Sequence, residues 1–188
     1  MFRAVAAVML VSLCLCASLA AMPEQDYIKM TQQCIHPPFR MDMPFSEEIA
    51  PCEAWVKEVE SGGYSDQEKS LAYTNRGRIF GWAYVEQSKA DINKAIDLDP
   101  QNAHALSIRG DFNFFDKRDA QCVSDYAKVL DIDRKTFGDF RLYARISICY
   151  ERSGDIEKAV QYSRNYLKIM RNEWHERRLE ELEKRLKH

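Results

Sequence analysis

The sequence predicts an all-α array of about three helical hairpins, and three observations lead to this fold class. Residues 91–99 align with 125–133 at a constant shift of 34 residues, and Arg76-Gly77 recurs as Arg109-Gly110. A third copy lies a further 37 residues along the chain. Signals that end and restart a helix divide each copy into two helices. The predicted units cover about 70–100, 103–134 and 140–171, within a repeat region of 64–171.

Small residues stand at one matching place in each predicted helix. Two helices approach closely only where small side chains meet, so these places predict the crossing points. A large side chain at one of the glycines should cost about 1 to 3 kcal/mol through overpacking. The small residues are Gly77, Gly110 and Ser147 in the first helices, and Ser88, Cys122 and Ala159 in the second helices.

The helix boundaries follow from caps and breaks. Ser65-Asp66-Gln67-Glu68 is a capping box that opens a helix predicted to run to about Tyr84. Breaks are expected at 86–88, 117–119 and 153–155. Gly154 is expected to take a left-handed conformation, and Asp155 to cap the next helix.

Residues 1–21 have the pattern of a secretory signal. Arg3 supplies a basic head, residues 4–21 are apolar or small, and cleavage is expected after Ala20 or Ala21. The alternatives are an uncleaved membrane anchor or a lipoprotein acylated at Cys14 or Cys16. Cleavage predicts an exported protein with no stable membrane insertion.

Four cysteines remain after cleavage, and an even number in an exported chain predicts two disulfides. Cys34 and Cys52 flank a proline-rich loop. A disulfide between them would stabilise the folded protein by on the order of 3 kcal/mol. Cys122 and Cys149 fall on helices that are neighbours in a stacked array, so a bridge is reasonable there too. The alternative is that both are buried small apolar residues.

Two segments flank the repeats. Residues 22–63 are predicted to hold an orphan helix that begins between Ser46 and Pro51, after a short helix near 24–33. Residues 172–188 are predicted to form a C-terminal helix that caps the last apolar face, in preference to a coiled coil or a membrane helix. Its apolar row is Trp174 or His175, then Leu179, Leu182 and Leu186.

A period of 34 residues with these small and large positions resembles the tetratricopeptide repeat. That resemblance implies a right-handed superhelix whose first helices line a concave groove. Pro100 closes the first unit as the family prefers, whereas Arg134 stands where a later proline would be expected. Asn113 replaces the usual aromatic residue of the second unit.

Residues 48–52, 70–77 and 97–100 are more closely similar to exported tetratricopeptide proteins of alphaproteobacteria. In those proteins a helix with a cysteine precedes the first full hairpin. The resemblance implies a periplasmic location and supports the pairing of Cys52 with Cys34. It implies no particular activity.

The family geometry also predicts which residues face a partner. Trp82 and Phe115 occupy equivalent places in successive units, so they could form an aromatic step for a peptide or a partner's helix. The alternative is that one or both are ordinary packing aromatics. The places that bind a terminal carboxylate in chaperone-binding relatives do not carry the matching residues here, so that ligand is not expected. The predicted groove residues are Thr74, Arg78, Trp82, His104, Ser107, Asp111, Phe114, Phe115, Arg141, Glu151 and Arg152.

The composition and motifs give no support to several classes of function. A formal charge of -2, from 27 basic and 29 acidic residues, gives no reason to expect a nucleic-acid partner. The four histidines lie in no metal-binding spacing, and no nucleophile or phosphate-loop motif is present, so no enzyme activity, cofactor or metal is predicted. The predicted function is an exported scaffold, periplasmic or secreted, for a protein or peptide partner. The alternative is a redox-responsive or structural protein of the cell envelope.

Overall fold

The computed structural model describes residues 22–36, 44–132 and 140–187, and the regular structure within them is α-helical. The predicted signal, part of the proline-rich loop and the segment before the third unit lie outside the described residues. The helices are α1 (Glu24–Ile35), α2 (Phe45–Glu60), α3 (Asp66–Phe80), α4 (Val85–Leu98), α5 (Ala103–Phe115), α6 (Asp119–Ile132), α8 (Phe140–Arg152), α9 (Ile156–Ile169) and α10 (Glu173–Leu186).

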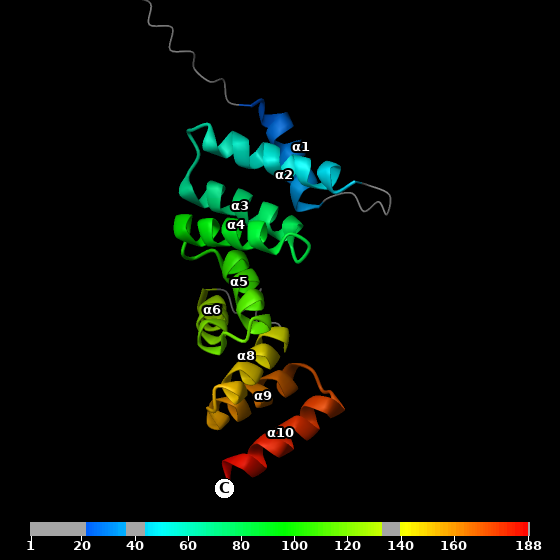
Figure 1. The fold of residues 1–188 in the computed structure, drawn as a ribbon, viewed down its shortest axis with the longest axis vertical. Helices are drawn as coiled ribbons and strands as arrows, with labels where there is room; N and C mark the ends of the chain where they lie inside the picture. Colours follow the sequence, from blue (N-terminus) through cyan, green and yellow to red (C-terminus); the bar gives the residue numbers. More distant parts are fainter. Residues whose placement is uncertain (1–21, 37–43, 133–139, 188) are drawn as a thin grey trace, which may run out of the picture.

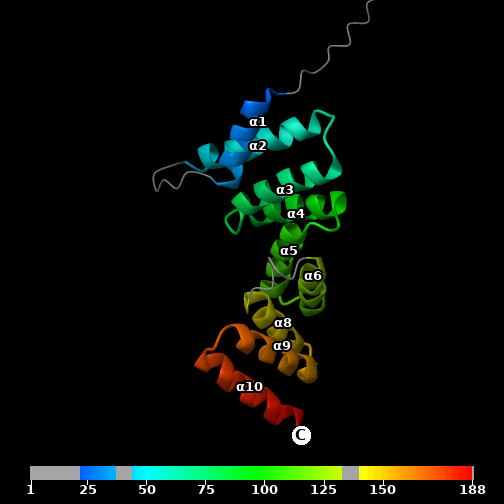
Figure 2. The same ribbon diagram turned by 180° about the vertical axis from the view of Figure 1, so that it is seen from behind.

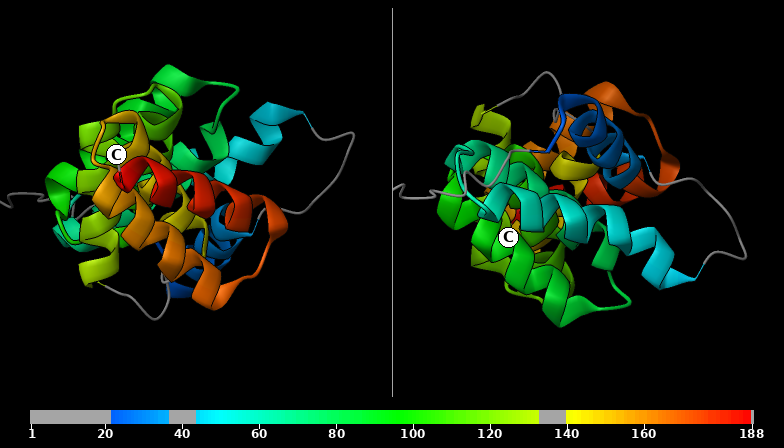
Figure 3. Two further views of the ribbon diagram at one scale, coloured as in Figure 1. Left: turned by 90° about the horizontal axis from the view of Figure 1, so that it is seen from below. Right: turned by 90° about the horizontal axis from the view of Figure 1, so that it is seen from above.

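The helices form an elongated stack that runs from α1 at one end to α10 at the other (Figure 1). The view from behind shows the same order along the long axis (Figure 2). Each helix packs mainly against its neighbours in the chain, in the pairs α3–α4, α5–α6 and α8–α9. Seen along the long axis, the pairs point in different directions (Figure 3). This is the predicted all-α solenoid, in which each repeat contacts only its neighbours.

The predicted crossing points are confirmed by close contacts between paired helices. The Ser88 hydroxyl donates to the carbonyl of Gly77 at 2.6 Å, and the Ser147 hydroxyl donates to the carbonyl of Ala159 at 2.8 Å. A Cβ added at Gly110 would lie 2.6 Å from the ring of Tyr126. The small residues therefore let each pair of helices approach.

The hydrophobic core follows the stack in three clusters. A central cluster joins α4, α5, α6 and α8, and a second joins α1, α2 and α3 around the buried Trp55. A third, smaller cluster lies between α9 and α10. The large side chains of Ile92, Leu106, Tyr126 and Ile146 are each at most 1% exposed.

Two predicted helix ends are confirmed. The capping box is present: the backbone N–H of Glu68 donates to the Ser65 hydroxyl, and the N–H of Ser65 donates to the Glu68 carboxylate. Gly154 has a φ of +87°, and the Asp155 side chain caps α9. The α8–α9 turn is therefore built as its residues predict.

Two other boundaries were predicted wrongly. The helix expected to reach Tyr84 ends at Phe80, because Gly81 takes a φ of +49°, so the break lies at 81–84 and not at 86–88. Helix α2 begins at Phe45 and holds Pro51 in its interior. The ring of Phe45 stacks on that of Tyr84 with centroids 4.4 Å apart, and this tertiary contact stabilises the additional helical turn.

Both predicted disulfides are present in the structure. Cys34 and Cys52 join α1 to α2 with an S–S distance of 2.09 Å, and Cys122 and Cys149 join α6 to α8 with an S–S distance of 2.14 Å. All four residues are fully buried. The second bridge fastens the second repeat unit to the third.

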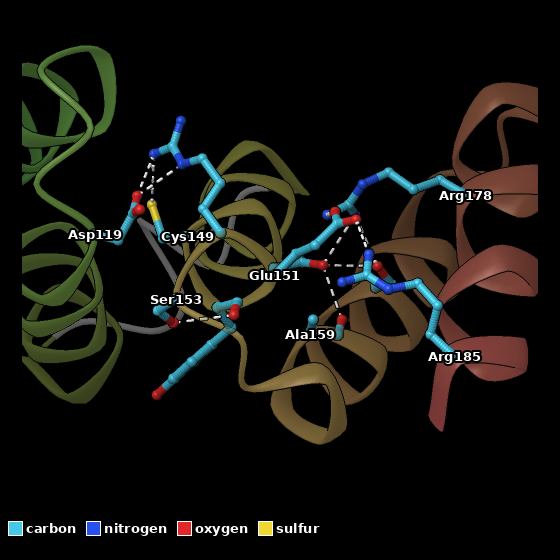
Figure 4. A network of polar contacts seen from close by, with 11 residues as sticks. Asp119, Cys149, Glu151, Ser153, Ala159, Arg178 and Arg185 are labelled. Atoms are coloured by element: carbon cyan, nitrogen blue, oxygen red, sulfur yellow. Dashed lines mark hydrogen bonds and ion pairs between the residues drawn. The ribbon is translucent and has the colours of Figure 1, made fainter. Parts of the chain in front are cut away.

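Helix α10 covers the end of the array, as predicted. Leu182 is 1% exposed, and the ring centroids of His175 and Tyr166 lie 3.8 Å apart. Trp174 and Leu186 are about half exposed, so the packed row is shorter than expected. Arg178 and Arg185 both bind the Glu151 carboxylate of α8, which holds the helix in place (Figure 4). Within the described part of the chain, no helix is long and apolar enough to span a membrane.

Candidate partner-binding surface

Four aromatic residues meet where the turn after α3 approaches the end of α5. The indole of Trp82 makes edge-to-face contacts with Phe112 and Phe115, with 4.9 Å between ring centroids in each case. Phe114 packs edge-to-face on Phe115 at 5.2 Å. Trp82 and Phe115 are each 56% exposed, whereas Phe112 is buried. We call these four residues the aromatic shelf.

Local backbone structure explains why the shelf reaches the surface. The positive φ of Gly81 ends α3, so Trp82 lies in a turn and not on a buried helix face. Phe115 is the last residue of α5, and two residues later Lys117 has a φ of +57°. Edge-to-face pairs add about 0.5 to 1.5 kcal/mol to the burial of the rings, so the shelf is formed before any partner arrives.

Three basic side chains lie over the shelf. The ammonium of Lys89 is 5.7 Å from the ring centre of Phe112, on the side of α4. From α8, the guanidinium groups of Arg152 and Arg145 lie 4.8 Å and 5.7 Å from the ring centre of Phe114. Each arrangement is a cation–π contact. The exposed rings therefore have a basic rim on two sides.

On the α8 side the rim charges are matched by carboxylates. Arg145 pairs with Asp111, and burial lowers the pKa of Arg145. Arg152 pairs with Asp119 at 2.5 Å and donates to the carbonyl of Phe114 at 3.0 Å. These contacts hold α8 against α5 and α6 and so fix the rim in place.

On the α4 side the rim charge is also paired with a carboxylate. Asp116 accepts from Lys89 at 3.0 Å and also from Arg118, so one carboxylate serves two cations. These two hydrogen bonds hold the pKa of Asp116 below its ordinary value. This carboxylate therefore links Lys89 of α4 to Arg118, which stands just before α6.

A small cavity adjoins the buried ring of Phe112. Its volume is about 70 Å³, and it lies between α4 and the α5–α6 hairpin. Among the described residues, its lining includes no acidic side chain. The lining residues are Lys89, Ile92, Asn93, Arg109, Phe112, Asn113 and Arg118.

Two similar ion pairs are structural. Arg76 binds both carboxylate oxygens of Asp91 at 2.7 Å, and Arg109 binds Asp125 in the same way at 3.0 and 2.7 Å. Both carboxylates are buried between the two helices of a unit. Asn113 donates to Asp125 at 2.8 Å, so the residue that departs from the family pattern serves this network.

Several predicted groove residues are occupied by internal contacts. Thr74 is 3% exposed and donates to the carbonyl of Ser70, so its prediction as a groove-facing residue is wrong. Arg78 donates to the carbonyls of Cys34 and Ile35 at the end of α1.

Three acidic or basic groove residues are also engaged. Asp111 accepts from Tyr126 and Arg145, while Arg152 is bound to α5 and α6. Glu151 is held by α10 on the opposite side of α8 from Cys149 and Asp119 (Figure 4). The sequence could not reveal these contacts because each joins residues far apart in the chain.

The remaining predicted residues fall into two groups. Trp82, Phe114 and Phe115 are brought together in the shelf. His104 and Arg141 lie exposed on α5 and α8, and Ser107 is partly buried on α5. Their role in partner binding stays a prediction.

Sequence reasoning missed Phe112, Lys89 and Arg145. Lys89 and Arg145 have no counterpart in the repeat pattern, so no periodic signal marks them. The aromatic run Phe112-Asn113-Phe114-Phe115 at a predicted helix end was the one available sign of a cluster. Among the described residues, no group of three or more histidine, cysteine or acidic side chains could hold a metal ion.

Comparison with known proteins agrees with this architecture. The family model described as tetratricopeptide repeat matches residues 140–172, which hold α8 and α9. Residues 140–172 are therefore a tetratricopeptide repeat. The chain is 30% identical to stress-induced-phosphoprotein 1 of Caenorhabditis elegans over 106 residues. This aligned segment covers 54% of the chain. This chain spans 33% of that relative's length.

A solved structure has a similar helical fold. The N-terminal domain of stress-induced protein-1 (STI-1) from C. elegans superposes with a TM-score of 0.52 at 23% identity, over 64% of this chain and 99% of that domain. At this identity the likeness shows the fold. The closer likeness to exported alphaproteobacterial proteins stays a prediction.

Proposed function

We propose that this tetratricopeptide-repeat protein is an exported scaffold that binds a protein or peptide partner at the aromatic shelf. A role in protein–protein interaction follows from the family, whose stacked repeats offer extended binding surfaces. The finer proposal, that the shelf is the binding surface, rests on one observation. Trp82 and Phe115 stand side by side in edge-to-face contact, and each is 56% exposed.

Exposed aromatic residues of this kind suit partner binding. Tryptophan is enriched among the residues that dominate interface energies, and a pre-formed cluster loses little side-chain entropy on binding. The basic rim would orient a bound partner, because its positive charges lie on both sides of the rings.

Export is proposed from the N-terminal signal pattern and from the two disulfides. The alternative of a redox-responsive protein is less well supported, since all four cysteines are fully buried and a reductant would need the helices to open first. The bridges are better suited to holding the helices together.

A photoreactive residue in place of Trp82 tests the binding surface in cells. We expect a discrete cross-linked partner that is not captured by the same residue in place of Glu180, which is exposed on α10. Identical adducts at both positions would contradict binding at the shelf. Cell fractionation with mass measurement of the mature N-terminus tests export, and a protein that retains residues 1–21 in the cytoplasm would contradict it.

A further inference from the structure

The backbone nitrogen of Met22 lies beside a carboxylate of the neighbouring helix. Met22 stands just before α1, and its N–H donates to Glu58 Oε1 of α2 at 3.1 Å, across 36 positions of the chain. The Met22 side chain is partly buried and packs against the core cluster that α1, α2 and α3 share. These contacts fix the position of the Met22 nitrogen relative to the carboxylate.

Glu58 accepts hydrogen bonds but has no ion-pair partner within the described part of the chain. Its second donor is the hydroxyl of Tyr64, which lies 2.9 Å from the same oxygen. The ring of Tyr64 stacks on that of Tyr27 in α1, with 5.6 Å between centroids. Both donors are uncharged while Met22 is an internal residue, so the carboxylate is held without a counter-charge.

The surroundings of this carboxylate are acidic. Burial and then the hydrogen bond to Glu58 raise the pKa of Tyr64 to about 12. Tyr27 and the carboxylate of Glu68, at the start of α3, act in the same direction. Each of these groups disfavours further negative charge and favours positive charge.

The start of α1 also affects a charge at this place. A cation at the first turn of a helix is opposed by the positive end of the helix dipole. Glu24 and Asp26 lie in the first turn of α1 and offset that field. Glu58 adds the one directed contact to the Met22 nitrogen, so the site suits a cation in spite of the dipole.

We propose that Met22 is the first residue of the mature protein and that its α-ammonium group forms an ion pair with Glu58. A protease of the export machinery hydrolyses the Ala21–Met22 peptide bond. Water adds to the Ala21 carbonyl carbon and the C–N bond breaks, so the products at neutral pH are the Ala21 carboxylate and the Met22 ammonium. The inference rests on the proposed function, because it takes the signal as removed.

The ion pair would complete the attachment of α1. The Cys34–Cys52 disulfide ties the last turn of α1 to α2, and the contact between Met22 and Glu58 ties its first turn to the same helix. A charge-assisted hydrogen bond is roughly twice as strong as a neutral one. The disulfide needs an oxidising compartment, and the ammonium needs cleavage, so both links are complete only after export.

Mass measurement and NMR titration of the exported, isotope-labelled protein test the inference. The mature chain should begin at Met22, and the pKa of its α-amino group should lie above the ordinary range of about 7.7 to 8.0. Glu58→Gln keeps an acceptor oxygen and should return the pKa to that range. Glu47→Gln, an exposed change in the same helix, should leave it raised.

Thermal unfolding gives a second measurement. Acetylation of the α-amino group removes its charge and keeps an N–H donor, so it should lower the Tm of the unchanged protein but not that of Glu58→Gln. Since the folded-state pKa of the amine is raised, the stability from the ion pair is complete below the ordinary pKa and is lost as the pH rises through the folded one.

The outcomes separate this inference from the proposed function. A mature chain that begins at Ala21 overturns the assignment of Met22 and leaves export intact, whereas a chain that retains residues 1–21 overturns both. An amine whose pKa is ordinary, or stays raised in Glu58→Gln, overturns the ion pair alone. Partner capture at Trp82 is independent of each of these results.

Discussion

The rings of Trp82 and Phe115 lie 4.9 Å apart at an interplanar angle of 83°, although 33 positions separate them in the chain. They occupy equivalent places in successive repeats, so the stacking of one unit on the next brings them together. Both remain more than half exposed, which makes their contact a property of the surface and not of the core.

Replacement of Trp82 should separate binding from folding. Because the indole is more than half exposed, Trp82→Ala should lower the free energy of unfolding by only about 1 kcal/mol while removing most partner capture. Trp174→Ala, at a similarly exposed tryptophan on α10, is the matched control and should leave capture unchanged. Chemical denaturation and affinity capture measure the two effects, and equal loss of capture in both variants would contradict the assignment.

Gly110 should tolerate a methyl group less well than Gly77. A Cβ at Gly110 would lie 2.6 Å from the rigid ring of Tyr126, whereas a Cβ at Gly77 would meet the flexible end of Ile92 at 3.0 Å. We expect Gly110→Ala to destabilise the protein by about 1 to 3 kcal/mol and Gly77→Ala by less. Urea unfolding of both variants gives the comparison, and a larger effect at Gly77 would contradict the structural explanation.

Removal of the bridge between repeat units should destabilise the array. The Cys122–Cys149 disulfide closes a loop of 27 residues, and its loss should cost on the order of 3 kcal/mol. The double variant Cys122→Ala with Cys149→Ala avoids leaving a buried hydroxyl and isolates this effect. Alkylation of the unfolded, unreduced mature protein should label no cysteine, and two labelled cysteines would show that one bridge is absent.

Removing the carboxylate charge from the ion pair of the second unit should destabilise the protein more than the same change in the first unit. Asp125 accepts hydrogen bonds from Arg109 and from the buried Asn113, whereas Asp91 accepts from Arg76. Asp125→Asn should therefore cost about 1 to 3 kcal/mol, more than Asp91→Asn. Unfolding curves in urea measure both, and equal losses would indicate that the Asn113 contact contributes nothing.

The docking of α10 should weaken in mild acid. Burial against Tyr166 and the charge of Arg178 lower the pKa of His175 below its ordinary value of 6.5. The unfolded chain then binds the proton more readily, so the stability contributed by neutral His175 is complete above pH 6.5 and is lost as the pH falls through 6.5 toward the folded pKa. His175→Phe keeps an aromatic ring and should flatten the change in Tm between neutral and mildly acidic pH. An unchanged slope in that variant would place the pH dependence elsewhere.

Much of the fold could be predicted because its signals are local or periodic. The capping box at Ser65, the left-handed Gly154 and the small residues at the crossings each follow from the conformation or size of single residues. The break after α3 was placed too late because the pattern gives Gly81 no more weight than its neighbours. Packing of Phe45 on Tyr84 likewise extended α2 beyond its expected start.

The candidate site was predicted only in part. Trp82 and Phe115 were found because they repeat, whereas Lys89 and Arg145 reach the shelf from helices whose side chains follow no repeat at those positions. Thr74 and Glu151 were predicted to be accessible because the repeat pattern does not show that Ser70 and α10 engage them.

By itself, the sequence determined the class of this protein: a stack of helical hairpins with small residues at the crossings and cysteines placed to bridge neighbouring helices. The periodic pattern is enough to predict this class, because every unit packs its two helices together in the same way. Only the tertiary structure decided which polar side chains are used up in internal pairs and which exposed rings meet. Those outcomes depend on distances between units, and the orientation of one unit on the next sets those distances.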